Sequence, residues 1–569
     1  VAADHDPMGT RFYRGYRGII VGALKHRLLT GALVIAAFMG GMTLMGQVPA
    51  LFFPPDNQPF LVVKMTLPIG TPIEKIDEVA KSVEGYLQDE LGAARTAEMV
   101  WNPETRVWQH KYTYVGEGVT TSATFVGGGT PKFVLGFSPD PPTPNSAVIL
   151  ANATSDVITT EMMPKIERFA QDRFPDLRIV AERLQSGPPV ADPVAVRVSG
   201  QDQAALFRIV EQVKKRFAET PGTRDITDNW GRFSKKLLIN IDAARTQRVG
   251  ASNQDVAVSL QTGLSGVSQT SFREGDKSIP ITLRAASAER QDIGKLETLN
   301  IYASQTGQPI PLKQIAEPEL VWEPAVILRR DGALSVNISS QLAPGANAAV
   351  VAKELGALIA EDHKGWPTGY RYEVGGAADA SNEANKSIGD KMPLALAIII
   401  MLLIGTFNSL RRAAIVLLTI PLAMIGVSIG LYTMGSYFGF MTLLGIISLA
   451  GIVINNAIVL LDRIRIEIED NGLEPSHAIL QAAQLRLRPI LLTTATTVGG
   501  LIPLWLGGGV MWEPMAISII FGLLFATLLT LGVVPLLYSV FYRVSYKGFD
   551  VNAYYPPAET APTTEAAPA

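Results

Sequence analysis

Six stretches of the chain are apolar over about 20 residues, the length that an α-helix needs to cross roughly 30 Å of hydrocarbon. They lie at 28–46, 392–410, 413–434, 440–461, 489–506 and 516–540. Residues 47–391 separate the first stretch from the second and are of mixed polar sequence, whereas the later connections are short. The pattern therefore predicts a membrane α-helical bundle of one helix plus five, with a large polar domain between them.

Basic residues near the ends of these stretches predict the orientation of the bundle. The loops 435–439 and 507–514 carry Glu513 and no Lys or Arg. The other ends carry Arg11, Arg14, Arg17, Lys25, Arg27, Arg411, Arg412, Arg463, Arg465, Arg486, Arg488, Arg543 and Lys547. Because cytoplasmic loops are enriched in Lys and Arg, both termini are expected in the cytoplasm and the polar domain outside. Residues 11–27 mix aromatic and basic side chains, and either lie along the membrane surface or form a short solvated helix.

The polar domain repeats a strand, a helix of about four turns and a strand. Residues 60–68 alternate as a strand, and 71–91 follow as an amphipathic helix with Thr71 as the expected N-cap. The same order recurs at 146–185, 193–242 and 333–374. This repetition predicts a large extracytoplasmic α+β domain built from βαβ subdomains of the ferredoxin-like kind.

Composition narrows the class of function. The 569 residues are 47% apolar and 18% charged, which suits a membrane protein with a polar domain, and the net charge of -3 gives no support for a nucleic-acid partner. The chain has no cysteine and its five histidines are scattered, and it contains no P-loop, HExxH or GxSxG motif. We expect a transporter rather than an enzyme, with no metal site and no cofactor, and interpret Met162 and Met163 as core residues.

Polar side chains interrupt two of the predicted membrane helices. Asn455 and Asn456 lie in 440–461, and Thr493 and its neighbouring threonines lie in 489–506. Such residues either line a polar path or bond helices together, and the residues alone leave both interpretations open. No acidic residue lies inside the six stretches away from their ends, so this chain provides no obvious proton carrier.

Several motifs resemble one known family. The segments GIVINNAIVLL at 451–461, QLRLRPILLTT at 484–494 and FFPPDNQPFLVVKMTLPIGT at 52–71, together with the order of one helix, a domain and five helices, resemble the C-terminal half of resistance-nodulation-division (RND) transporters. The hydrophobe/amphiphile efflux subgroup of AcrB type is the most similar. The resemblance implies a homotrimer in the inner membrane that exports hydrophobic or amphiphilic compounds by drug/proton antiport with alternating access.

The same resemblance implies partners and site residues. The partners would be an N-terminal half that carries the proton-binding aspartates, a periplasmic adaptor, an outer-membrane channel and membrane lipid. Asn455, Arg486 and Thr493 fall on the family's proton relay, where Asn455 replaces a lysine, and Asn456 lies beside them. Phe125 and Phe133 flank a glycine-rich loop and are the candidate substrate-binding residues, followed by Trp101 and Trp108.

Family comparison also divides the chain into domains. The expected parts are a linker remnant and basic helix (1–27), the first membrane helix (28–50), a first porter subdomain (51–140), a second porter subdomain (141–188 with 322–380), a docking subdomain (189–321), the five-helix bundle (381–545) and a disordered cytoplasmic tail (546–569). A different interpretation remains open: a non-pumping membrane-anchored scaffold, or a translocation accessory similar to SecDF, whose polar membrane residues only pack helices.

Overall fold

The computed structural model describes residues 10–102, 107–188, 190, 192–231, 233–284, 299–324, 326–343, 345–546 and 549. The chain divides into two compact units, a main unit of Val1–Asp228 with Arg329–Ala569 and an inserted unit of Asn229–Leu328. The expected tail 546–569 lies almost entirely outside the described residues, as does the linker remnant up to residue 9.

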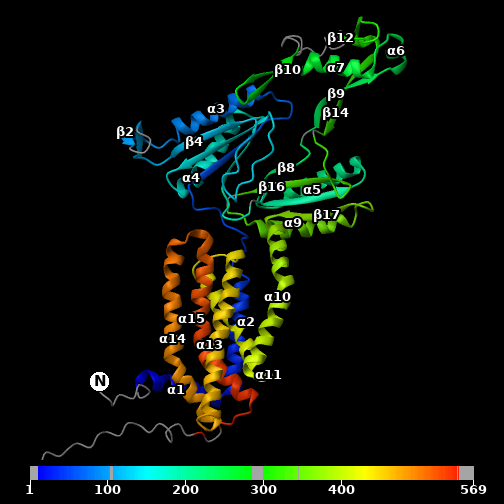
Figure 1. The fold of residues 1–569 in the computed structure, drawn as a ribbon. Coiled ribbons are helices and arrows are strands. Elements are labelled where there is room, and N and C mark those ends of the chain that lie inside the picture. The colour runs from blue at the N-terminus through cyan, green and yellow to red at the C-terminus, as the bar shows by residue number, and fades with distance from the viewer. Residues whose placement is uncertain are drawn as a thin grey trace, which may run out of the picture. The chain divides into compact units, whose positions relative to one another are not determined.

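Six helical segments of the described residues are long and apolar enough to cross a membrane, and each contains most of one predicted stretch. They run side by side in Figure 1. They are α2 (Arg27–Met45), α10 (Ala377–Phe407), α11 to α12 (Leu410–Thr433), α13 (Phe440–Glu469), α14 (Pro475–Gly507) and α15 (Gly509–Phe541). The third segment is not one continuous α-helix, because Pro421 lies in a short 3-10 turn, η4 (Ile420–Leu422), between α11 (Leu410–Thr419) and α12 (Ala423–Thr433).

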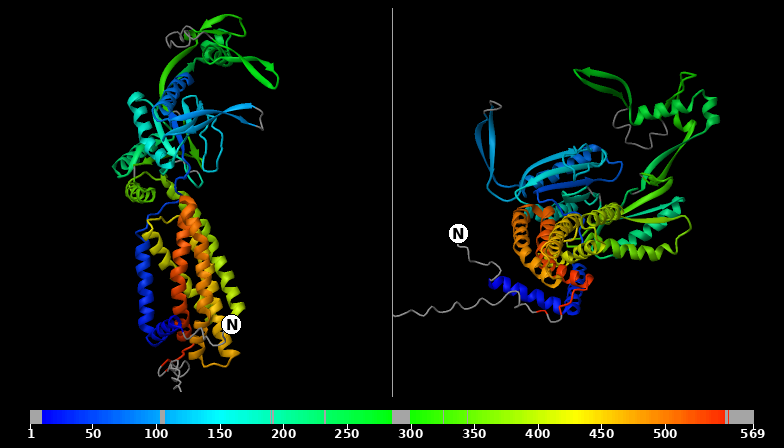
Figure 2. Two further views of the ribbon diagram at one scale, coloured as in Figure 1. Left: turned by 90° about the vertical axis from the view of Figure 1, so that its left-hand side faces the viewer. Right: turned by 60° about the horizontal axis from the view of Figure 1, so that its bottom comes forward.

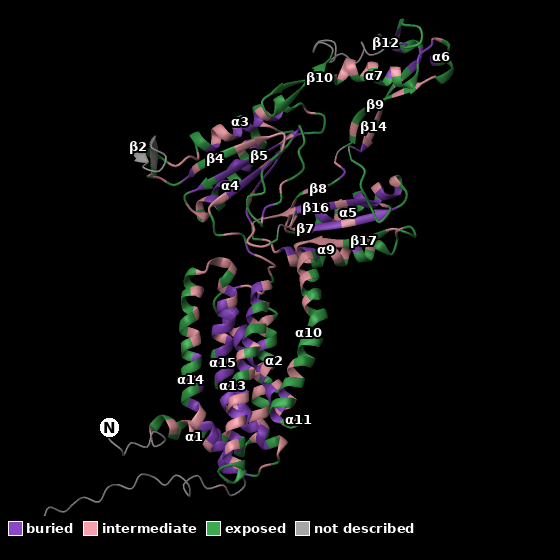
Figure 3. Cartoon of the chain, in the orientation of Figure 1, coloured by how far each residue is buried: buried purple, intermediate pink, exposed green. Residues whose placement is uncertain are grey.

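Helix α15 forms the centre of the bundle and packs against α11, α12, α13 and α14. Glycines permit its close contacts: a Cβ at Gly522 would lie 2.2 Å from Cδ2 of Leu449, and one at Gly426 would lie 2.4 Å from the backbone oxygen of Phe521. Within the apolar window of each helix, 67% of α15 is buried but only 11% of α14 and 6% of α10. Figure 3 shows this contrast, so the bundle leaves whole helix faces uncovered.

The basic segment near the N-terminus folds as helix α1 (Arg11–Lys25). Its apolar residues Ile20, Val21 and Leu24 are buried against the membrane helices. Tyr16 donates a hydrogen bond of 3.1 Å to the carbonyl oxygen of Leu531 on α15. The predicted helix is therefore present, and its apolar side packs against the end of the bundle.

The first α/β module runs from β1 (Phe60–Thr66) to β6 (Arg178–Arg183) and contains a four-stranded antiparallel sheet in the order β4-β5-β1-β6. The other two strands are β4 (Val119–Val126) and β5 (Ser146–Ala153), and the two helices are α3 (Ile73–Asp89) and α4 (Asp156–Arg173). Alternate residues Leu61, Val63 and Met65 of β1 point into the core under these helices. The opposite sheet face carries the aromatic residues described below.

The second module has the same strand–helix–strand–strand–helix–strand order. Its sheet joins β8 (Thr223–Asp228), β16 (Ala333–Leu342), β7 (Val194–Gly200) and β17 (Arg371–Gly376), with the short β15 (Arg329–Arg330) beside β16. Helices α5 (Gln203–Glu219) and α9 (Ala348–His363) pack against it. The long helix α10 follows β17 directly (Figure 1).

These sheets correct the expected boundary between the porter subdomains. Strands β5 and β6 lie in 141–188, which we expected in the second subdomain, yet both hydrogen-bond to β1 of the first. The sequence pattern identifies each βαβ segment but not its partner in the sheet, because strand pairing is non-local. The expected N-cap is also wrong by one residue: Pro72 caps α3, and the Thr71 hydroxyl donates to the oxygen of Pro68.

The described residues of the inserted unit form two α-helices, one short 3-10 helix and several strands. Its long ladder pairs β9 (Phe233–Ile241) with β14 (Ala316–Pro324). Its small core includes Val256, Ile301, Leu312 and Ile315. The remaining elements are α6 (Ala243–Arg248), α7 (Asn253–Leu264), β10 (Val267–Glu274), β11 (Lys277–Leu283), β12 (Asn300–Tyr302), β13 (Pro309–Pro311) and η3 (Leu312–Gln314), several of them visible in Figure 2. The chain enters this unit after β8 and leaves it before β15. The unit is therefore an insertion in the sequence between two strands of the second module.

Candidate functional site

Four phenylalanines gather on the face of the first sheet that α3 and α4 leave free. Phe60 of β1 and Phe125 of β4 are partly buried against Val62 and other core residues of this face. The ring of Phe133 lies 5.1 Å from that of Phe60 and 5.1 Å from that of Phe137, centroid to centroid. We call these four residues the phenylalanine cluster. It combines a buried ring, Phe137, with a Phe133 side chain that is 44% exposed.

Three consecutive glycines create the cluster. Gly127, Gly128 and Gly129 have φ angles of 77°, 92° and 89°, which side chains with a Cβ rarely adopt. A Cβ at Gly128 would also lie 2.4 Å from Cα of Pro142. The chain leaves β4 through this turn and returns across the sheet, so that Phe133 and Phe137 pack over Phe60. The two predicted residues Phe125 and Phe133 therefore lie on one surface.

Charged side chains lie on the same sheet face. Lys64, which alternates with Phe60 and Val62 along β1, forms an ion pair of 2.7 Å with Glu182 of β6. Burial lowers the pKa of Lys64, but Glu182, Asp140 and Asp192 outweigh that effect and hold the pKa above its ordinary value. Burial raises the pKa of Asp192, and a hydrogen bond from Ser339 opposes the rise. The face is thus amphiphilic, with aromatic rings beside a paired cation.

Trp101 and Trp108 lie elsewhere in the fold. They are paired across the hairpin of β2 (Arg95–Asn102) and β3 (Val107–Tyr114), a two-stranded sheet separate from the one that carries the phenylalanine cluster. Their side chains lie outside what the structure describes.

The adjacent asparagines of α13 face different surroundings. Asn456 is 5% exposed and lies on the helix side that buries Val453, Ala457 and Leu460. Asn455 is exposed, because neighbouring residues point about 100° apart around a helix. It shares an uncovered face with Ser448 and Gly451, and a Cβ at Gly451 would meet no atom within 4 Å.

The neighbouring helix α14 has a similar division. Thr494 is buried and shares a hydrogen bond of 2.8 Å with Thr527 of α15. Thr493 is exposed, and its hydroxyl donates to the oxygen of Pro489 on the same helix at 2.9 Å. Arg486, two turns before Thr493, is half-buried, and its Nε is buried without a hydrogen-bond partner within the described chain.

The structure places the four predicted relay residues on two helices that pack together, α13 and α14. In the part of the chain that the structure describes, no hydrogen bond joins Asn455, Asn456, Arg486 and Thr493 to one another. Asn455 and Thr493 point away from the packed interior, whereas Asn456 points into it. The amide of Asn455 is therefore open to groups outside these six helices, whereas the hydroxyl of Thr493, which already donates to Pro489, can still accept a hydrogen bond from such groups.

Sequence reasoning missed two members of the phenylalanine cluster, Phe60 and Phe137. The alternation of β1 provides a signal for Phe60, since Phe60, Val62 and Lys64 must share one face of a strand. No local pattern identifies Phe137, because its position depends on the return of the chain after the three glycines.

Comparison with known proteins identifies a related family. The sequence profile of the AcrB/AcrD/AcrF family matches residues 151–542. The swarming motility protein SwrC of Bacillus subtilis is 23% identical over 549 residues, which cover 95% of this chain and 48% of SwrC. The chain thus spans about half the length of that relative.

Other relatives have different substrates in their names. The cobalt-zinc-cadmium resistance protein CzcA of Cupriavidus metallidurans is 28% identical over 62% of this chain and 34% of CzcA. The multidrug resistance protein MdtC of Klebsiella pneumoniae is 28% identical over 60% of this chain and 34% of MdtC. A crystal structure of a heavy metal efflux pump has a TM-score of 0.70 at 22% identity, over 93% of this chain and 51% of the pump. At this identity the structural likeness shows a shared fold.

Proposed function

Because the chain belongs to the AcrB/AcrD/AcrF family of RND efflux transporters, we propose that it acts as the C-terminal half of a proton-driven pump for hydrophobic or amphiphilic compounds. Family membership and the six long apolar helices support a multi-pass membrane protein that is a transporter rather than an enzyme. The proton coupling, the missing half and the substrate class are our proposals.

The uncovered faces of α13 and α14 are the observation that carries the proposal. Asn455 and Thr493 are exposed at the level of the apolar helices, where an amide without a partner costs several kcal/mol in hydrocarbon. Small residues on the same faces, Gly451 on α13 and Gly500 on α14, have open space at the Cβ position. Such faces suit further helices that approach closely and supply hydrogen-bonding groups. The N-terminal half is the proposed source of those helices.

In this arrangement Asn455, Arg486 and Thr493 face the carboxylates of the partner half. An amide hydrogen-bonds a carboxylate in either protonation state but does not neutralise its charge. Arg486 then provides the cation of the relay, since guanidinium remains protonated. Asn456 and Thr494 stabilise the packing of this half.

The phenylalanine cluster supports a hydrophobic substrate. Binding sites for drug-like molecules are mainly apolar and aromatic with a few polar groups, and Phe133 is exposed beside Phe60 and the Lys64–Glu182 pair. Within the described residues there is no group of three or more His, Cys, Asp or Glu side chains placed to hold a metal ion. We therefore favour hydrophobic substrates over the cations named for CzcA.

The remaining features of the proposal concern assembly. In the proposed topology both termini lie in the cytoplasm, six helices cross the inner membrane, and the two α/β modules, of ferredoxin-like type, lie in the periplasm. The basic residues near the helix ends support this orientation. Trimer formation, with an adaptor and an outer-membrane channel, is proposed from the family.

Dye extrusion by the two-half protein tests the proposal. The variant Arg486→Ala should assemble at normal levels in the membrane yet lose proton-dependent extrusion of a hydrophobic dye. The matched control is Arg488→Ala, which removes an exposed arginine of the same helix and should extrude normally. Normal extrusion by Arg486→Ala would contradict the relay assignment, and a scaffold would keep its function in both variants.

A cation substrate is the second candidate, because the heavy metal efflux pump shares the fold of this chain. Uptake of zinc or cobalt by everted vesicles separates the two substrate classes. Metal transport that survives Phe133→Ala, with no dye transport in the parent protein, would replace the hydrophobic proposal.

A further inference from the structure

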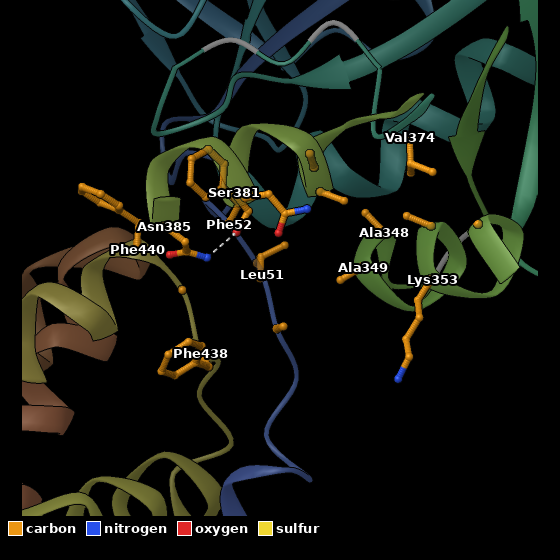
Figure 4. Close-up of a pocket in the computed structure, with 17 residues that line it drawn as sticks. Leu51, Phe52, Ala348, Ala349, Lys353, Val374, Ser381, Asn385, Phe438 and Phe440 are labelled. Atoms are coloured by element: carbon orange, nitrogen blue, oxygen red, sulfur yellow. Dashed lines mark hydrogen bonds between the residues drawn. The ribbon is translucent and has the colours of Figure 1, made fainter. Parts of the chain in front are cut away.

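A cavity of about 520 Å³ lies where the second α/β module meets the membrane helices of the main unit. Its walls come from α9, the start of α10, the chain after α2 and the chain before α13 (Figure 4). Its volume is in the range of small-molecule binding sites. The cavity shares no lining residue with the phenylalanine cluster or with Asn455, Arg486 and Thr493, so the function proposed above does not use it.

Backbone hydrogen bonds hold the walls of this cavity in place. The amide of Leu51 donates to the oxygen of Phe438 at 3.0 Å, and the amide of Phe438 donates to the oxygen of Pro49 at 2.8 Å. Asn347, the N-cap of α9, reaches across and donates its side-chain amide to the oxygen of Ala50 at 2.8 Å. Elements that are distant in sequence are thus tied together around the space, as expected for a preformed site.

Apolar and polar groups occupy different parts of the wall. Phe52, Phe438 and Phe440 provide aromatic rings at the level where α13 begins. Aromatic side chains favour this boundary between hydrocarbon and headgroups. The cavity therefore has an apolar part that is continuous with the predicted edge of the bilayer.

The polar groups come from α10 and α9. Ser381, Asn382 and Asn385 line the cavity from one turn of α10. Asn385 precedes the apolar run that starts at Met392 by two helical turns, which places it about 10 Å above the hydrocarbon edge. That height lies just beyond the headgroup layer, which adds about 5–7.5 Å on each side of the hydrocarbon. The polar groups of α10 therefore form the water-facing end of the cavity.

Lys353 adds a positive charge to the cavity wall. It lines the cavity from α9, is exposed, and extends in Figure 4 toward the side on which the membrane helices lie. Within the described chain it forms no ion pair with an acidic side chain. An ammonium group is a suitable donor for phosphate oxygens.

We propose that this cavity binds an anionic phospholipid of the outer leaflet, with its phosphate at Lys353 and its glycerol and upper acyl chain against Leu51 and Phe52. The lower acyl chains remain in the bilayer. The lipid is a resident ligand that fills the junction between the second module and the bundle. This site requires neither transport nor the N-terminal half.

Retention of lipid by the purified full chain tests the site. The chain is reconstituted in vesicles of equal amounts of phosphatidylglycerol and phosphatidylcholine, extracted in mild detergent, and weighed by native mass spectrometry. One phosphatidylglycerol should stay bound in preference to phosphatidylcholine. Lys353→Gln should reduce that preference about tenfold, the ratio that corresponds to 1.4 kcal/mol. Ser381→Trp, which fills the cavity, should abolish retention of both lipids.

Two control variants test whether the lipid binds in this cavity. The first tests nonspecific attraction of anionic lipid to basic residues, and the second tests binding at the phenylalanine cluster. Lys391→Gln removes a cation of α10 that lies next to the apolar run but does not line the cavity, and should retain phosphatidylglycerol like the parent. Phe133→Ala should also retain it, because the phenylalanine cluster is a different site. Equal retention by the parent and Lys353→Gln, or an equal loss in Lys391→Gln, would overturn the proposal. Displacement of the lipid by an uncharged dye would instead assign the cavity to transported compounds.

Discussion

Two of the described ion pairs join the two α/β modules. Arg178 of β6 lies 3.0 Å from Asp225 of β8, and Glu167 of α4 pairs with Arg224 of β8. Removal of the second pair should loosen the contact between the modules. Glu167 of α4, whose side chain is 11% exposed, lies 2.7 Å from Nη1 of Arg224 on β8. It also accepts a hydrogen bond of 3.1 Å from the amide of Ala181. Arg224 donates in addition to the oxygen of Leu342 at 2.8 Å. Glu167→Gln keeps an acceptor for Ala181 and removes the negative charge, so it isolates the ion pair.

The expected magnitude follows from the exposure of the pair. A hydrogen bond to a charged group contributes about 1.5–3 kcal/mol. Arg224 is 40% exposed, and solvent screening reduces the value to the lower part of that range, about 1.5–2 kcal/mol. A local opening that is easier by this amount should accelerate amide exchange about 10- to 30-fold. The effect should appear in β6 and β8, the strands beside the pair.

Hydrogen exchange measured by mass spectrometry on the full chain in detergent detects this change. The matched control is Lys75→Gln, which breaks an exposed pair with Glu78 in the same module and should leave exchange within about twofold. Unchanged exchange of β6 and β8 in Glu167→Gln would refute the reasoning. So would an equal acceleration in Lys75→Gln, because burial would then have no influence on the contribution of the pair.

Three further changes have defined outcomes. Gly522→Ala should cost about 1–3 kcal/mol by overpacking the bundle, seen as a lower yield of monodisperse chain on size exclusion, whereas Gly532→Ala, with nothing within 4 Å of its Cβ, should behave like the parent. Hydrogen bonds from Arg216 hold the pKa of Asp362 below its ordinary value. This pair therefore stabilises the second module at pH values above the unfolded pKa of Asp362, and the stabilisation is lost as pH falls through the lower folded pKa. Amide hydrogen exchange of α5 and α9 should rise in acid, and should rise less in Asp362→Asn. In the two-half protein, Phe133→Ala should raise the dye concentration for half-maximal extrusion while normal membrane levels are kept, and an unchanged value on a dose curve would remove Phe133 from the substrate site.

Hydropathy predicted where the long apolar helices lie, because the requirement for about 20 apolar residues is local. It did not predict their ends. Helix α10 begins at Ala377, before the apolar run, because polar residues above the bilayer continue the same hydrogen-bonded helix. It also did not predict the turn at Pro421, where a missing N–H interrupts an otherwise apolar segment.

Sequence patterns did not predict which strands pair with one another in the sheets. The βαβ repeats were recognised, yet β5 and β6 were expected in a different subdomain from β1. Alternation of apolar and polar residues indicates which face of a strand is buried, but it does not indicate which strand lies beside it. The same limit applies to the phenylalanine cluster. Phe125 and Phe133 were predicted from the glycine-rich loop, whereas Phe137 reaches Phe60 only through the return of the chain over the sheet.

Burial, rather than residue type, distinguishes the two adjacent asparagines: one packs helices together, and the other belongs to the proposed relay. Asn456 is enclosed by this chain's own helices, so its amide contributes to the bundle whether or not a second half is present. Asn455 is exposed on the same helix, and its cost in hydrocarbon disappears only when another polar group meets it. Asn455 stands where the resemblance places a lysine in the family. An uncharged amide at this position leaves the proposed partner carboxylates without one neutralising cation, which favours their protonated form. Arg486, with its buried unpartnered Nε, is then the cation that remains to compensate their charge.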